Sequence, residues 1–130
     1  MTRALGITVA LALTLSGCHH SERRAAADRK KAELLHERDD ASAAYNDCAL
    51  KRAAGYASST GTPAEIAEAV LAECDGALAG LRIAVEQWMM ASVSTQAGRQ
   101  AVLREADNFS QSTRDQMRGI IIGAVLRKRK

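Results

Sequence analysis

The sequence predicts an all-α fold, an antiparallel helical hairpin closed by a disulfide with a third helix packed on it. Alanine, the strongest helix former, is abundant among the 130 residues, and Pro63 is the only proline. Apolar residues recur every seven positions, the spacing of helix-on-helix packing, while the alternation typical of strands is almost absent. We therefore expect one small domain whose thin core needs support.

Residues 1–17 have the parts of an export signal. Arg3 and the amino terminus supply positive charge, and residues 4–14 form an apolar run. As a helix this run would be about 16 Å long, too short to cross a hydrocarbon core of roughly 30 Å. We expect a cleaved signal peptide rather than a transmembrane helix. The alternative is a buried N-terminal helix with an accidental cysteine.

The signal ends in Leu15-Ser16-Gly17-Cys18, which resembles the lipobox of bacterial precursors cut by signal peptidase II at all four positions. The resemblance implies removal of residues 1–17, a diacylglycerol thioether on Cys18, and acylation of its new amino group. The bilayer would then be a partner through Cys18, in the bacterial cell envelope. His19 follows the cysteine, where Asp would favour inner-membrane retention, so the periplasmic face of the outer membrane is favoured. The resemblance covers these residues alone.

The mature chain, 18–130, divides by composition into a charged tether, 18–33, and a three-helix domain with a basic tail, 34–130. The tether could be helical or flexible. The tail, Arg127-Lys128-Arg129-Lys130, carries four positive charges, so these residues are candidates for contact with anionic lipid. Nucleic acid is not an expected partner, because export removes that target and no aromatic residues are interleaved with the charges.

The first helix is expected over 21–57, ordered from about Leu34, before a turn at 58–61. Thr62-Pro63-Ala64-Glu65 then predicts a capping box, with Thr62 as N-cap and Glu65 reaching back to its amide. The second helix would run to about residue 92 and the third over 97–127. The expected core positions are Leu34, Ala41, Ala44, Tyr45, Cys48, Ala67, Leu71, Cys74, Leu78, Leu81, Val85, Trp88, Val102, Ala106, Phe109, Thr113, Met117, Ile120 and Ala124.

Cys48 and Cys74 remain once Cys18 is lipidated, and an oxidising compartment favours their pairing. In an antiparallel hairpin, facing residues lie at equal distances in sequence from the turn, and the midpoint between Cys48 and Cys74 is Gly61. The same register places Leu34 opposite Trp88. We predict a structural disulfide; a redox-active pair is disfavoured because CxxC spacing is missing.

Other clusters indicate no chemistry. His36 lies too far along a helix from His19 and His20 for one metal site, and Glu37, Asp39 and Asp40 are more typical of a solvated face. The Trp88-Met89-Met90 segment is expected to pack in the core. Catalytic triads and phosphate loops are missing, so we expect no enzyme, cofactor or metal.

The segment 119–126 is apolar nearly all round, and its Gly119 and Gly123 have G-x-x-x-G spacing. It either completes the core or contacts a partner or the membrane surface. We expect a structural or protein-interaction module with an envelope protein partner, and self-association through apolar helix faces is an option. The alternative is a small binding, inhibitor or exclusion lipoprotein acting on an incoming or secreted protein.

Overall fold

The chain divides into two units, residues 1–33 and residues 34–130, which we call the N-terminal unit and the helical domain. The computed structural model describes the backbone from Ala12 to Arg129 and the side chains from Ser21 to Arg129. Within the N-terminal unit, residues 21–33 are helical and exposed. The side chains of the lipobox, 15–18, and of His19 and His20 lie outside the described residues, as does Lys130.

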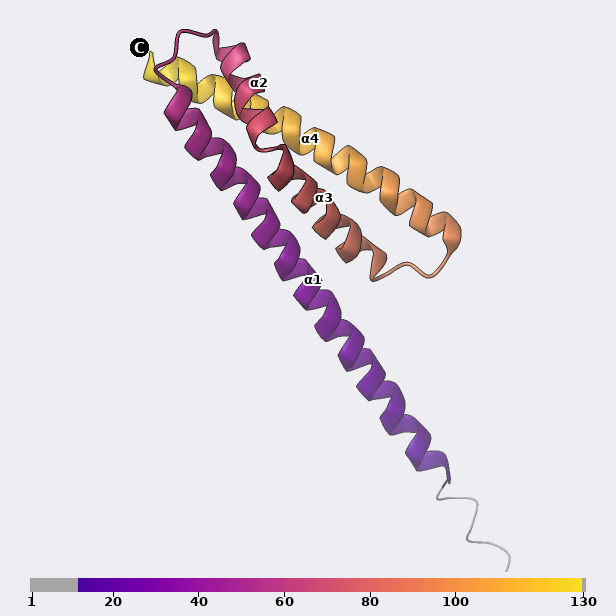
Figure 1. Ribbon diagram of the computed structural model, residues 1–130. Coiled ribbons are helices and arrows are strands. Elements are labelled where there is room, and N and C mark those ends of the chain that lie inside the picture. The colour runs from indigo at the N-terminus through magenta and orange to yellow at the C-terminus, as the bar shows by residue number, and fades with distance from the viewer. Residues whose placement is uncertain (1–11, 130) are drawn as a thin grey trace, which may run out of the picture. The chain divides into compact units, whose positions relative to one another are not determined.

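Four helices make up the described chain: α1 (Ala12–Tyr56), α2 (Pro63–Glu73), α3 (Asp75–Met90) and α4 (Gln96–Lys128). The all-α fold is thus confirmed, with one helix more than expected. In the helical domain, α1 and α4 run toward the same end, and α2 and α3 run in the opposite direction (Figure 1).

The extra helix arises because the expected 62–92 helix is interrupted at Cys74. This residue ends α2 and precedes α3, with φ −100° and ψ 8°. Gly76 weakens helix propensity just after it, and Asp75 is favourable in the first turn of a new helix. The apolar seven-residue repeat passes through the interruption, since Leu71 and Leu78 are both buried. Periodicity alone therefore could not reveal the break.

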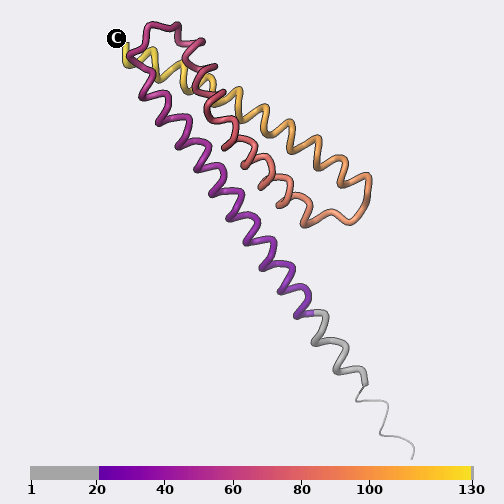
Figure 2. The backbone as a smooth tube through the Cα atoms, viewed as in Figure 1, coloured from indigo at the N-terminus to yellow at the C-terminus, as the bar shows by residue number. Residues whose placement is uncertain are grey.

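The helical domain turns between α1 and α2 and again between α3 and α4 (Figure 2). A threonine caps the helix that follows each of these turns. Thr62 and Glu65 form the predicted capping box at the start of α2. Thr95 caps α4 by accepting a hydrogen bond from the Gly98 amide at 3.1 Å. A Cβ at Gly98 would lie 2.6 Å from Val93 Cγ1, so the close approach of this turn requires glycine.

The core of the helical domain draws side chains from all four helices. Burying each large aliphatic side chain contributes about 1.5–3 kcal/mol, whereas the alanines of α1 contribute less and permit close approach. The clustered residues are Tyr45, Ala49, Ala53, Ile66, Ala67, Val70, Leu71, Cys74, Leu78, Leu81, Val85, Ala106, Met117, Ile121 and Val125.

Three of the expected core positions are wrong, because Ala44, Phe109 and Ile120 are exposed. Six others are only half-buried: Leu34, Ala41, Cys48, Trp88, Thr113 and Ala124. Along the C-terminal half of α4, buried residues instead follow steps of four, from Met117 to Ile121 to Val125. A step of four advances about 40° beyond a full turn, so the buried stripe winds around α4. A strict seven-residue repeat does not describe that winding.

Ion pairs fix α4 against α2 and α3. Arg82 Nε lies 2.5 Å from Asp107 Oδ1, and Arg114 pairs with Asp75. In both pairs the two residues lie at equal distances in sequence from the turn at residues 94 and 95. This symmetry is expected for antiparallel helices, here α3 and α4, that are joined by that turn. The aspartates are exposed and the arginines half-buried, so water screens these pairs in part and they specify register more than they stabilise the fold. A further pair joins Arg118 to Glu68 on α2, with Nε and Oε1 2.6 Å apart.

Candidate functional site

The predicted disulfide between Cys48 and Cys74 is present, with the two Cα atoms 6.0 Å apart. This separation is within the range that a disulfide spans without backbone movement. Cys48 lies on α1, and Cys74 is the buried residue between α2 and α3. The bond therefore fixes α1 to the junction of the next two helices.

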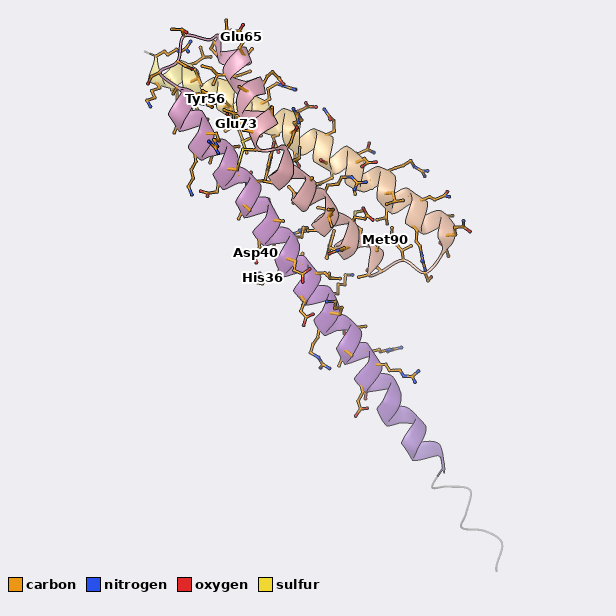
Figure 3. The ribbon with its side chains drawn as sticks, in the orientation of Figure 1. His36, Asp40, Tyr56, Glu65, Glu73 and Met90 are labelled. Carbon is orange, nitrogen blue, oxygen red and sulfur yellow. A yellow bond between two sulfur atoms is a disulfide. The ribbon has the colours of Figure 1, made fainter. Side chains whose placement is uncertain are left out.

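A polar cluster lies beside this bond, at the end of α1. The Tyr56 hydroxyl donates a hydrogen bond to Glu73 Oε1, and Arg52 Nε lies 3.1 Å from Glu73 Oε2 (Figure 3). The hydrogen bond to Glu73, and then the negative charge of that carboxylate, raise the pKa of the Tyr56 hydroxyl. Arg52 is exposed, and the arrangement ties α1 to α2.

The basic end of α4 contacts the end of α1 and the turn after it. Arg129 Nη2 donates to the Ser59 and Gly61 carbonyl oxygens at 2.6 and 2.7 Å, and Lys128 Nζ donates to the Ala54 carbonyl at 3.4 Å. The last turn of α1 has no basic residue of its own, so these cations complement its negative dipole end. Two of the four membrane-contact candidates therefore have contacts within the domain.

This basic end lies far from where the helical domain begins. α1 spans about 33 Å from Leu34 to Tyr56 at 1.5 Å per residue, and Lys128 and Arg129 contact its Tyr56 end. Arg127 is also in the last turn of α4 and is exposed. Contact of these residues with lipid stays a prediction.

The remaining candidate residues are not brought together. His36 is highly exposed and has Nε2 3.7 Å from Asp40 Oδ2, one turn along α1 (Figure 3). Asp39 accepts a hydrogen bond from Arg38, its neighbour in sequence. Among residues 21–129, no three side chains of His, Cys, Asp or Glu are grouped so that they could hold a metal ion.

Trp88 is only half-buried, and the guanidinium carbon of Arg38 lies 4.8 Å from its ring centroid. This contact is a cation–π interaction. Arg38 lies one turn along α1 from Leu34, the residue that the sequence predicted to face Trp88.

The Tyr45 hydroxyl is the one polar side-chain atom, among those the structure describes, that is buried without a hydrogen-bond partner. The side chain is fully enclosed in the core, and burial raises the pKa of its hydroxyl. Sequence reasoning placed Tyr45 near the core but gave no sign of this orphaned group. Its consequence is energetic, because the hydroxyl has lost its hydrogen bonds to water.

The most distinctive surface is the side of α4 that faces away from the other helices. A Cβ added at Gly119 would have no heavy atom within 4 Å, and Ile120 and Leu126 nearby are exposed. We call Gly119, Ile120, Gly123 and Leu126 the outward face of α4. A surface of this kind can make contacts with another macromolecule.

Comparison with known proteins adds no relative: no protein family, curated protein or solved structure matches the chain. Between residues 12 and 129, none of the helices combines the length and the apolar character that crossing a membrane requires.

Proposed function

We propose that this chain is a membrane-anchored envelope lipoprotein whose helical domain acts as a structural or protein-interaction module. The observation that carries the proposal is the lipobox, Leu15-Ser16-Gly17-Cys18, after a short apolar run. Acyl chains on Cys18 would hold the protein at the outer membrane, and residues 19–33 would connect that anchor to the domain. The outer membrane is favoured by His19 in the position after the cysteine.

The surface of the helical domain supports an interaction role. Single exposed apolar residues are ordinary on proteins, but α4 carries four large ones, more than any other helix among the described residues. They are Leu103, Phe109, Ile120 and Leu126. Buried side chains such as Ala106, Met117 and Ile121 hold α4 against α2 and α3, so little conformational entropy is lost when α4 binds.

Photo-crosslinking in intact cells tests this proposal. A crosslinking amino acid in place of Phe109, on α4, should capture a resident envelope protein that carries its own export signal. The same amino acid in place of Leu50, an exposed residue on α1, is the matched control. Capture of an incoming or secreted protein at Phe109 would favour the inhibitor or exclusion role. Equal, nonspecific labelling at both positions would contradict an interaction surface on α4.

A further inference from the structure

Two glycines on the outward face of α4 have no role in packing within the domain. A Cβ at Gly119 would meet nothing within 4 Å, and one at Gly123 would meet only Arg127 Nη1, at 3.4 Å. Glycine is a weak helix former, so two glycines one turn apart in a 33-residue helix are unfavourable for α4 alone. Close approach of another backbone would give them a function.

The outward face points away from the core. Residues two apart in a helix are separated by about 200°. Ile121 and Val125 are fully buried, so Gly119 and Gly123, two positions before each, face the opposite direction. This agrees with the open space at Gly119, whereas the flexible side chain of the exposed Arg127 lies over Gly123.

Large apolar side chains flank the glycines. Ile120 is 46% exposed and Leu126 is 50% exposed, while Ile122 is half-buried at the edge of the core. A strip of glycine between larger aliphatic residues lets two helices approach closely while the aliphatic side chains pack at its sides. The face therefore fits another helix.

The charged residues at the two ends of the outward face indicate which helix can dock on it. Asp115 lies one turn before Gly119, and Arg127 lies one turn after Gly123; both are exposed. In an antiparallel pair of α4 helices centred on Ile121, Gly119 faces Gly123 of the second copy and Asp115 faces its Arg127. A parallel pair would instead place Arg127 against Arg127. The face is thus complementary to itself under a two-fold axis.

From this complementarity, we infer that a second copy of this chain docks on the outward face of α4, antiparallel and centred on Ile121. A lipid surface fits less well, because Lys128 and Arg129 donate to carbonyl oxygens within the domain and Asp115 borders the face. The inference concerns the helical domain and does not depend on the lipid anchor of the proposed function.

The test is the dimer dissociation constant of the full chain in non-ionic detergent, measured by sedimentation and by energy transfer between labelled copies. Gly119→Leu should raise that constant at least about tenfold, because the side chain would hold the helices apart. Gly80→Leu is the matched control, since Gly80 on α3 also has nothing within 4 Å of a Cβ. Both variants should fold, since leucine improves helix propensity. A full chain that is monomeric throughout, or an equal effect of both variants, would overturn the inference.

A charge exchange tests the register. Arg127→Asp should weaken the dimer severalfold, and adding Asp115→Arg should restore it, because the opposite charges then face each other again. Asp115 also lies 2.7 Å from Arg118, so thermal melts must show that both variants remain folded. Failure of the double variant to recover would rule out the antiparallel register. A monomer that binds phosphatidylglycerol vesicles through Gly119 and Leu126 would replace the second copy with lipid.

Discussion

Cys48 joins α1 to Cys74, the residue at which α2 ends and α3 begins, so a single covalent bond connects three helices. On the α1 side, the buried cluster contains one large side chain, Tyr45, beside the small residues Ala49 and Ala53. Alanines bury little apolar area, so the apolar packing of α1 depends mainly on Tyr45. The disulfide at Cys48 adds a covalent contact near it.

Reduction of this disulfide should lower the free energy of unfolding by about 3–4 kcal/mol, as the chain-entropy treatment gives for a sequence separation of 26. Denaturant titrations with and without reductant measure the difference without substituting any residue. Non-reducing peptide mapping should find the two cysteines linked within one chain. Free thiols at both positions, or a link only between chains, would remove the basis for α1 packing.

Thr62→Ala should lower the free energy of unfolding by about 1 kcal/mol, the usual effect of removing an N-cap oxygen. Thr62 Oγ1 accepts a hydrogen bond from the Glu65 amide at 3.2 Å, and that amide would lose its partner. Thr60→Ala, in the same turn, is the control because Thr60 is exposed and lies outside the cap. Equal denaturation midpoints for the two variants would show that the cap contributes nothing.

The stability of the domain should fall in acid partly through Glu65. Its carboxylate accepts from the Thr62 amide at 2.7 Å, and this bond and the one with the Thr62 side chain lower its pKa. The stabilisation is fully present above the unfolded-state pKa of about 4.3 and is lost as pH falls through the lower folded value. Glu65→Gln should therefore flatten the decline between about pH 5 and pH 2, compared with a Glu37→Gln control. Identical profiles for both variants would contradict this assignment.

Tyr45→Phe should leave stability unchanged or raise it by about 1 kcal/mol, because it removes a buried hydroxyl without a hydrogen-bond partner. Tyr45→Ala should instead cost about 3–5 kcal/mol, since it empties the space of a fully buried ring. Both values come from denaturant unfolding. A loss of more than about 1 kcal/mol on Tyr45→Phe would mean that the hydroxyl makes a favourable interaction.

The features that the sequence predicted correctly depend on neighbouring residues or on simple geometry. The capping box at Thr62 is defined by four consecutive residues, and the turn before it sets the register that brings Cys48 to Cys74. The capping box and the hairpin register can each be derived from one local rule, without knowing how the helices pack. The same rule applies to the cap at Thr95, where the available signal is a hydroxyl three residues before Gly98.

What could not be predicted depends on how helices cross. Phe109 and Ile120 follow the seven-residue repeat but are exposed, because α4 packs on α3 near its start and on α2 and α1 near its end. The buried side therefore changes along its length. The interruption at Cys74 could not be predicted from the apolar repeat, because the repeat of buried residues continues unchanged on both sides of it. The Asp75-Gly76 pair was the available signal.

The intact mass of the protein extracted from bacterial membranes tests the central claim, an acyl-anchored helical domain, most directly. We expect one species that begins at Cys18, carries a diacylglycerol and an amide-linked acyl chain on that residue, and retains the Cys48–Cys74 bond. Cys18→Ala should abolish both the cleavage and the added mass. An unmodified chain, whether it begins at Met1 or at another cleavage site, would contradict the claim.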